Sequence, residues 1–225
     1  MEPFENREAW EEKYRAAADP WRFDGSLYDL ARTRTLLDRL RYARFKKHLD
    51  AGCGEGFFTD QLSKLSDEVH GFDIAEAAVA RARERYPRIR FFQADVRDLD
   101  AAGARDFDFI SCVEMLYYIR DLDARDRALR ALADAGRPNC LYYFEIKVKS
   151  YGNPRFIPLA EFLEQAGRYF NPIDVFPALA YPAKPLRALL RLPVSMDLRV
   201  RALSRLMARM DLDDAHSIGY LAVKR

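Results

Sequence analysis

The sequence predicts an α/β fold built on a doubly wound, mostly parallel β-sheet. Across residues 44–146, short strand-like runs alternate with longer helical stretches, which is the pattern of repeated β-α units. Acidic residues follow several of these strands, at the edge where open parallel sheets bind ligands. The turn after the first strand carries three alternating glycines, in the sequence L-D-A-G-C-G-E-G.

Two helices are expected before the sheet begins. Aromatic residues recur at helical spacing between charged ones, which predicts an amphipathic helix over residues 4–18. Asp19-Pro20 should end this helix, because the residue before a proline disfavours helical geometry. A second helix is expected near residues 27–41.

The elements of the sheet follow in chain order. The first strand, residues 44–49, is unusually polar for the centre of a parallel sheet. Further strands are expected at residues 68–72, 89–93, 107–113, 141–146, 173–179 and 217–223, with helices at 55–65, 75–86, 122–135 and 158–170. We expect one domain over residues 1–225, made of a helical cap (1–42), a ligand-binding core (43–180), a helical insertion (181–215) and the last strand (216–225).

Composition excludes several classes of protein. With 49% hydrophobic and 32% charged residues the chain can build a large core, and a net charge of +2 favours no polyanionic partner. Three cysteines without C-x-x-C spacing predict reduced, buried thiols and no zinc site. The start M-E-P-F-E-N-R-E lacks the regions of a secretory signal and no apolar run suits a transmembrane segment, so a cytoplasmic protein is expected.

The glycine-rich turn, residues 49–56, is the first candidate site. Glycines 52, 54 and 56 let the backbone turn tightly and approach a ligand with no Cβ in the way. The spacing differs from the G-x-G-x-x-G of NAD-binding folds, which would need a glycine at Phe57. A purely structural glycine turn is the alternative interpretation.

Two carboxylates at strand ends extend this candidate site. Asp73 ends the second strand, where a carboxylate can accept hydrogen bonds from both hydroxyls of a ribose. Its alternative role is to cap the helix that begins near Ala75. Asp95 follows the third strand, and its alternative role is an ordinary turn at a strand end.

These motifs resemble those of a known family. The D-x-G-x-G-x-G at residues 50–56 is similar to the first motif of the class I S-adenosylmethionine (SAM) methyltransferases, which have a Rossmann-like, seven-stranded sheet. The sequences D-P-W at 19–21, S-L-Y at 26–28 and E-M-L-Y-Y at 114–118 resemble the subgroup of nodulation-factor N-methyltransferases, which act on the amino sugar of a chito-oligosaccharide. The resemblance covers roughly residues 10–147.

The resemblance implies that SAM is the cofactor and S-adenosylhomocysteine (SAH) the product. Asp50 and the glycine turn would hold the methionine end, Asp73 the ribose, and Asp95 with Val96 the adenine. The expected cofactor-binding residues are Asp50, Ala51, Gly52, Cys53, Gly54, Gly56, Asp73, Ile74, Asp95, Val96 and Glu114.

Glu114 is the expected catalytic residue, because it ends the fourth strand beside the expected methyl group. A hydroxyl acceptor benefits from a general base, whereas an amine need only be unprotonated. Glu114 would serve as that base or orient the acceptor; a surface carboxylate that caps a helix is the alternative. His216 is a second candidate base. His48 and His70 lie in strands and are expected to be structural, and no metal site is expected.

The acceptor is expected to be a small molecule, with a sugar or natural-product amine or hydroxyl foremost. Trp21, Tyr28, Tyr117 and Tyr118 would form the wall of its pocket, although each could instead belong to the core. Nucleic acid is not expected, since V-E-M-L stands where a D/N-P-P-Y/F motif would follow the fourth strand. Methylation of a protein, a non-catalytic SAM-binding partner and a homodimer all stay open.

Arginines recur at intervals of four residues before the last strand. Arg201, Arg205 and Arg209 share one helical face, and Arg187 and Arg191 repeat the spacing upstream. A solvated face over a core helix is the plain interpretation. A lid for an acidic or phosphorylated substrate, a dimer surface and contact with an anionic membrane are the others.

Overall fold

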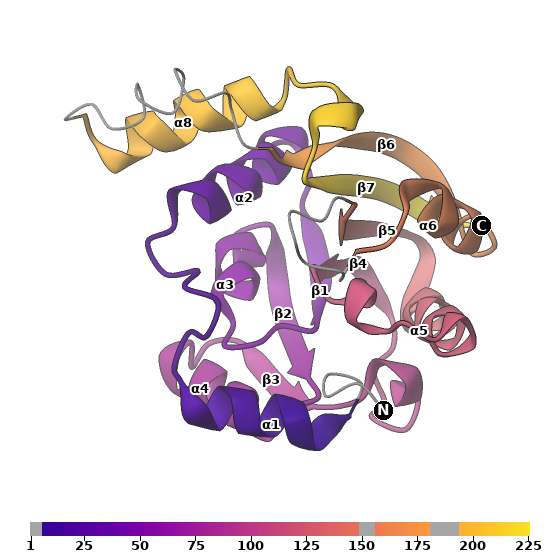
Figure 1. The fold of residues 1–225 in the computed structure, drawn as a ribbon. Helices are drawn as coiled ribbons and strands as arrows, with labels where there is room; N and C mark the ends of the chain where they lie inside the picture. Colours follow the sequence, from indigo (N-terminus) through magenta and orange to yellow (C-terminus); the bar gives the residue numbers. More distant parts are fainter. Residues whose placement is uncertain (1–5, 149–155, 181–193) are drawn as a thin grey trace.

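The chain folds around a seven-stranded mixed sheet (Figure 1). The structure is a computed structural model, and it describes residues 6–148, 156–180 and 194–225. The strand order is β3-β2-β1-β4-β5-β7-β6, in which β7 alone runs antiparallel to its neighbours β5 and β6. The strands are β1 Phe45–Ala51, β2 Ser66–Asp73, β3 Arg90–Gln93, β4 Phe107–Val113, β5 Gly136–Lys147, β6 Phe170–Leu179 and β7 Ser217–Lys224. The predicted seven-stranded, mostly parallel sheet is therefore confirmed.

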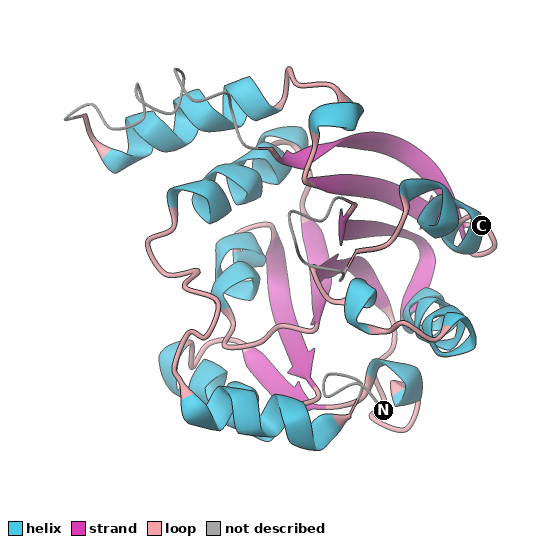
Figure 2. Cartoon of the chain, viewed as in Figure 1, coloured by secondary structure: helices cyan, strands magenta, loops and turns pink. Residues whose placement is uncertain are grey.

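Helices cover both faces of this sheet (Figure 2). They are α1 Arg7–Ala16, α2 Leu27–Arg39, α3 Phe57–Ser63, α4 Glu76–Arg85, α5 Leu122–Ala135, α6 Leu159–Ala166 and α8 Met196–Met207, with 3-10 turns η1 Val96–Asp98, η2 Leu116–Tyr118 and η3 Leu212–Asp214. Side-chain caps fix where several of them begin: Ser26 accepts from the backbone N–H of Asp29, and Asp121 from that of Ala124. In the part of the chain that is described, no helix combines the length and the apolar character that a bilayer span needs.

The two largest differences from the predicted boundaries are the start of β5 and the end of α6. The strand β5 begins at Gly136, five residues before the predicted start at Leu141, because Gly136 already pairs with Phe107 of β4. The helix predicted over 158–170 ends at Ala166, since Phe170 pairs with Lys224 in the sheet. The polar residues of β1 lie in its first half, which is partly exposed, so their side chains can reach solvent. The backbone N–H groups of Lys46 and Lys47 there donate hydrogen bonds to Asp108.

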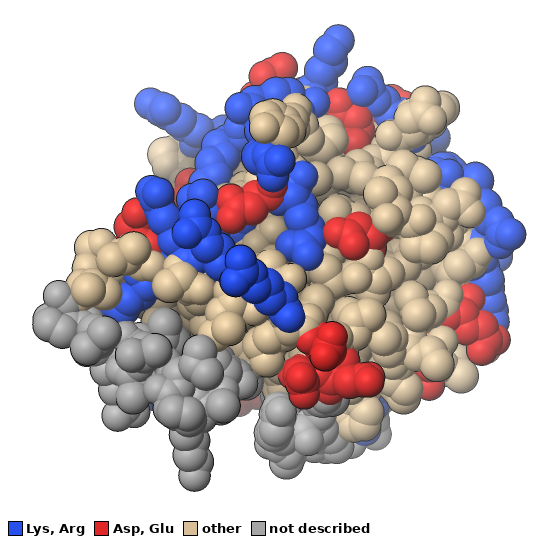
Figure 3. Space-filling model, turned by 90° about the horizontal axis from the view of Figure 1, so that it is seen from above, with Lys and Arg blue, Asp and Glu red and all other residues tan. Residues whose placement is uncertain are grey.

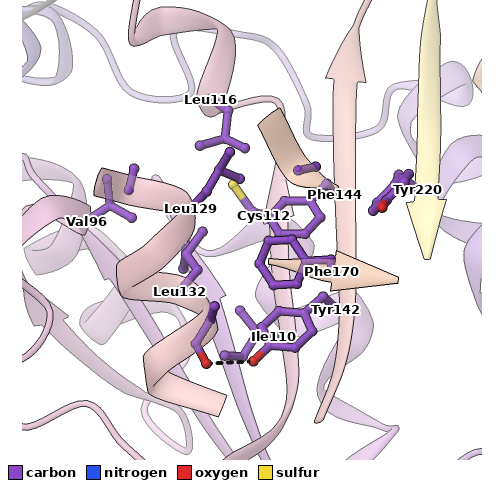
Figure 4. Close-up of a cluster of buried hydrophobic side chains, with 14 of the residues drawn as sticks. Val96, Ile110, Cys112, Leu116, Leu129, Leu132, Tyr142, Phe144, Phe170 and Tyr220 are labelled. Atoms are coloured by element: carbon purple, nitrogen blue, oxygen red, sulfur yellow. Dashed lines mark hydrogen bonds between the residues drawn. The ribbon is translucent and has the colours of Figure 1, made fainter. Parts of the chain in front are cut away.

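The largest hydrophobic cluster fills the space between the sheet and helices α5 and α6 (Figure 4). Leu129 and Leu132 of α5 pack there against Ile110 and Cys112 of β4. The Tyr142 hydroxyl donates a hydrogen bond to the backbone carbonyl of Ala133 at 3.0 Å, so the one polar group of this buried side chain has a partner. All three cysteines are free and buried, as predicted.

The opposite face carries α2 and α3, with α8 lying on α2. Leu203 and Met207 of α8 are fully buried, while Arg201, Arg205 and Arg209 are exposed. Figure 3 looks down on this side of the molecule, where Lys and Arg side chains gather with Asp and Glu between them. Arg187 and Arg191 lie outside the described residues, and the role of the arginine face stays a prediction.

A buried polar chain joins β1, β4 and α3. His48 Nε2 lies 2.8 Å from Ser111 Oγ, which donates to Asp50 at 2.6 Å, and Thr59 donates to the other oxygen of Asp50 at 2.6 Å. Burial lowers the pKa of His48 to about 3 and raises the pKa of Asp50 to about 6. His48 is therefore neutral at neutral pH and structural, as expected.

The substitution His48→Gln should make the protein less sensitive to acid. Unfolded His48 takes up a proton near its ordinary pKa of 6.5, whereas the folded residue does so only near 3, so wild-type stability is lost as the pH falls through this window. The stability advantage of the wild type over the variant should shrink by about 1.4 kcal/mol per pH unit between about pH 6 and about pH 4. Urea unfolding at several pH values measures this difference, and parallel curves would contradict it. Asp50 titrates in both proteins, so its opposite effect cancels.

Candidate active site

A cavity of about 470 Å³ opens at the carboxyl ends of the parallel strands. It is walled by the glycine turn after β1, by the residues that follow β2, β3 and β4, and by α1 with the loop over residues 19–24. This is the edge where doubly wound sheets bind ligands, and the volume suits a molecule of cofactor size.

The glycine turn forms one wall and tolerates no side chain at two positions. A Cβ on Gly52 (φ 71°) would lie 2.6 Å from Met115 Cγ, and one on Gly54 (φ 54°) would lie 2.8 Å from the Tyr14 hydroxyl. The backbone N–H groups of Gly52 and Cys53 both donate to the carbonyl of Phe72. The turn is therefore fixed on the end of β2, and Gly52, Cys53 and Gly54 line the cavity.

Asp73 lines the cavity and supports the glycine turn. One carboxylate oxygen accepts from the Gly54 N–H at 2.9 Å, and the other from the Ala75 N–H at 3.0 Å where α4 begins. Burial raises the pKa of Asp73, and these backbone hydrogen bonds act against the rise. A carboxylate has about four lone-pair sites, so acceptor capacity is left for ligand hydroxyls. The predicted ligand contact and the alternative helix-starting role are thus compatible.

Asp95 lies at the cavity rim after β3. Its oxygens accept from the backbone N–H and the guanidinium of Arg97. Partial burial raises the pKa of Asp95, but the hydrogen bonds from Arg97 outweigh this effect, and the pKa is lowered overall. Asp95 is thus a fixed, charged acceptor at this edge.

The structure brings most of the predicted cofactor residues to the cavity, but not all. Those that line it are Gly52, Cys53, Gly54, Asp73, Ile74, Asp95, Val96 and Glu114. Asp50, Ala51 and Gly56 do not: Asp50 is 2% exposed and both its oxygens are held by Ser111 and Thr59. In this geometry Asp50 does not contact a ligand in the cavity directly. Its side chain instead anchors the end of β1, from which the glycine turn begins.

Glu114 faces the cavity from the end of β4 in an uncommon backbone conformation. Its φ of 54° lies in the left-handed region, which costs a non-glycine residue about 1–2 kcal/mol. Ser217 donates to Oε1 at 2.6 Å and the Tyr117 hydroxyl donates to Oε2 at 3.0 Å. Both oxygens are thus held in place.

Behind Glu114 lies a buried ionic group that the sequence interpretation missed. Arg32 Nη1 lies 2.9 Å from Glu145 Oε1 and 3.4 Å from Glu114 Oε1, while Nη2 lies 2.9 Å from Asp29. We call Asp29, Arg32, Glu114 and Glu145 the Arg32 cluster. Burial raises the pKa of Glu145, and the Arg32 guanidinium opposes that rise. One signal was visible: Glu145 interrupts the apolar run of β5, where an ionised residue needs a partner.

Aromatic side chains close the cavity from the amino-terminal side. The Trp10 ring meets Tyr118 edge-on with centroids 4.8 Å apart, and Trp21 Nε1 lies 3.5 Å from the Tyr14 hydroxyl. Trp21, Tyr117 and Tyr118 line the cavity as predicted, and Trp10 and Tyr14 join them. From the sequence alone, Trp10 and Tyr14 are assigned only to a helix. Helical spacing shows which residues share a face, but it does not show that this face packs against the distant glycine turn.

Two predicted site residues lie elsewhere. Tyr28 packs against the cluster that contains Ala31, Leu203 and Met207, because α2 turns this side chain toward α8. Its expected place in the acceptor pocket is therefore wrong. His216 is 8% exposed and does not line the cavity; burial lowers its pKa, with Lys147 acting in the same direction. A role for His216 as the base stays without geometric support.

The amino-terminal segment is tied to the glycine turn through Glu55. Its Oε2 accepts from the Asp19 N–H at 3.0 Å, and its Oε1 meets Arg81 Nη1 at 2.7 Å. The same Arg81 nitrogen donates to the carbonyl of Ala17, and Arg85 pairs with Asp24 at 2.9 Å. These bonds hold the aromatic side chains over the cavity. Among the described residues, no three His, Cys, Asp or Glu side chains are grouped so as to hold a metal ion.

The strand order and the position of this cavity define the class I methyltransferase fold. The solved structure of the N-methyltransferase NodS from Bradyrhizobium japonicum WM9 in complex with SAH shares it, with a TM-score of 0.70 and 17% identity over 98% of both chains. The family model for Nodulation protein S (NodS) matches residues 3–148. The chain belongs to the NodS family.

Curated relatives are similar over part of their length. Nodulation protein S of Sinorhizobium fredii is 31% identical over 128 residues, which are 55% of this chain and 58% of the relative. A ubiquinone biosynthesis O-methyltransferase of Bordetella parapertussis is 32% identical over 96 residues, 41% of this chain and 40% of the relative. The match thus spans about half the length of these relatives.

Gly52→Ala should weaken ligand binding in the cavity, because the new methyl group would displace Met115 and the turn. We expect SAM affinity, measured by calorimetry, to fall at least about tenfold, since a misplaced binding loop loses its preorganised contacts. Gly103→Ala is the matched control: Gly103 also has a positive φ, 67°, but nothing lies within 4 Å of the added Cβ. It should show only the backbone cost of a left-handed alanine, about 1–2 kcal/mol in unfolding, and an unchanged affinity. Equal affinity loss in both variants would refute the steric account.

Proposed function

We propose that this protein transfers a methyl group from SAM to an amine or hydroxyl of a small-molecule acceptor, such as a sugar or natural-product intermediate. The observation that carries the proposal is one cavity that joins the glycine turn and Asp73 at one side to Glu114 and the aromatic wall at the other. Membership of the NodS family supports it, as do relatives named as N- and O-methyltransferases.

The residues present fit SAM. Gly52 and Gly54 line the cavity, and a Cβ on either would push against Met115 or Tyr14 of the same wall, so the glycines keep the wall in the shape against which a methionine chain can lie. Asp73 has acceptor capacity for the two ribose hydroxyls, and Val96 and Ile74 offer apolar contacts for the adenine. When bound, the sulfonium supplies an electrophilic methyl group; everything else in the reaction is positioning.

The chain itself would orient the acceptor and exclude water. Trp10, Trp21 and Tyr118 cover the cavity and can stack on a sugar face or favour a cation. Glu114 accepts one protein hydrogen bond on each oxygen and has lone pairs left for an acceptor N–H or O–H. For a hydroxyl acceptor it would take the proton as the hydroxyl attacks; for an amine it would orient the lone pair in line with the methyl.

An enzyme is a better account than a non-catalytic SAM-binding partner. A binding partner would need the glycine turn and Asp73 but has no use for a strained carboxylate at the far side of the cavity. Methylation of a protein is an alternative acceptor class for the same chemistry. The exclusion of nucleic acid, the homodimer and the cytoplasmic location stay predictions.

Binding and turnover can be tested with defined probes. Calorimetry with SAM, SAH and NAD should show binding of the first two and none of NAD. Incubation with SAM and the tetrasaccharide of glucosamine, compared with its fully N-acetylated form, should release SAH and reveal whether a free amine is required. Tight NAD binding without SAM binding would overturn the proposed function.

Glu114→Gln should lower kcat about 100-fold for a hydroxyl acceptor, because an amide cannot take up the proton. A smaller loss is expected for an amine acceptor, and SAM affinity should change by less than about threefold since ribose and turn contacts persist. Glu68→Gln is a control, as Glu68 is half exposed and pairs with His70 on β2 away from the cavity. Release of SAH measures turnover, and full activity of the Glu114→Gln variant would remove this carboxylate from catalysis.

A further inference from the structure

We infer that Arg32 is a positioning residue for methyl transfer: from behind, it holds the Glu114 carboxylate directed into the cavity. The inference rests on the proposed function, in which Glu114 meets the acceptor. It assigns a role to the buried Arg32 cluster, whose members come from three separate elements, α2, the end of β4, and β5.

The geometry makes Arg32 the link between these elements. Its Nη1 is shared by Glu145 at 2.9 Å and Glu114 at 3.4 Å, and its Nη2 meets Asp29 at 2.9 Å, one turn earlier on the same helix. Glu145 is fixed in turn by the Tyr143 hydroxyl at 2.9 Å. A guanidinium in this place presents its donors in a rigid plane, so Arg32 adds a fixed ionic contact to the hydrogen bonds that Ser217 and Tyr117 give Glu114.

Arg32 acts through Glu114 and does not itself reach an acceptor. The residue is 1% exposed and does not line the cavity. The rings of Phe58 and Phe23 lie 4.2 Å and 5.4 Å from its guanidinium carbon, and both rings do line the cavity. The cation is thus sealed beneath the cavity floor, where its field acts on Glu114 with little solvent screening.

Stability alone does not account for this cluster. One guanidinium meets three carboxylates, of which only Glu145 is as fully buried as Arg32 itself. A buried ion pair is often no more stabilising than an apolar replacement of the same volume. Such an arrangement is expected where a charge has to be kept at a defined place.

In the part of the chain that is described, Arg32 is the residue that forms an ion pair with Glu114. The titratable and charged groups that face Glu114 are Asp29 and Arg32 on α2, Tyr117 on η2, Glu145 and Lys147 on β5, and His216 before β7. Burial lowers the pKa of His216 and raises that of Tyr117, so both are neutral at neutral pH.

The test uses the double variant Arg32→Met/Glu145→Gln. The single change Arg32→Met would leave buried carboxylates uncompensated and is expected to fold poorly, whereas the double variant removes one charge of each sign. With SAM and the glucosamine tetrasaccharide, kcat should fall at least about tenfold while the KM for SAM stays within about threefold. Arg32→Lys, which keeps the charge, should recover part of the loss.

Arg39→Met is the matched control on the same helix. Arg39 pairs with Asp174 at 3.1 Å and stacks on Phe176, so its loss costs an ion pair and packing but touches neither the cavity nor Glu114. This variant should show lower stability with an unchanged kcat. If the double variant also keeps the wild-type kcat, Arg32 is merely structural and the inference is overturned.

A measurement without turnover separates this inference from the proposed function. A crystal structure of the double variant should show the Glu114 side chain turned away from its place in the wild type. An unchanged Glu114 conformation overturns the inference even if wild-type protein methylates the probe. If wild-type protein neither binds SAM nor releases SAH while Glu114 moves in the double variant, the proposed function fails and the positioning role of Arg32 stands.

Discussion

The candidate site depends on the hydrogen bonds that fix the glycine turn to the end of β2. Gly52 and Cys53 donate to Phe72, and Gly54 donates to Asp73. Through these bonds the same residues that shape the cavity also satisfy the buried backbone groups of the turn. Asp73 cannot be understood as a ligand contact alone, because its carboxylate also holds the turn and the start of α4. Cofactor recognition and local folding therefore share one set of contacts.

The sheet order explains why the second half of the site lies where it does. β1 sits between β2 and β4, so the glycine turn has Asp73 on one side and Glu114 on the other. Antiparallel β7 runs beside β5 and places Ser217 at the same edge, where it donates to Glu114. Residues more than a hundred positions apart thus meet at one carboxylate.

The sequence revealed the contacts that follow from strand ends and failed for those that depend on packing between distant elements. Gly52, Asp73 and Glu114 could be placed because each directly follows a strand or ends one, and parallel strands bring their carboxyl ends to one edge. Tyr28 was misplaced, since helical spacing does not tell which side of α2 faces α8. Arg32 was missed for the related reason that a basic residue in an amphipathic helix normally faces solvent. The boundary errors at Gly136 and Phe170 have a similar origin, because pairing with remote strands decides the conformation of both residues.

The family match covers all the described residues of the glycine-turn side of the site but only part of the Glu114 side. The matched residues, 3–148, contain the glycine turn, Asp73, Asp95, Glu114 and the Arg32 cluster. Ser217 lies beyond them, yet it makes the 2.6 Å hydrogen bond to Glu114 at the acceptor side of the cavity. The cofactor side is thus specified within the shared region, while the acceptor side also depends on a strand outside it. Because β7 is bonded to Glu114 while the glycine turn is bonded to β2, a substitution at Ser217 would act on Glu114 and leave the glycine turn in place.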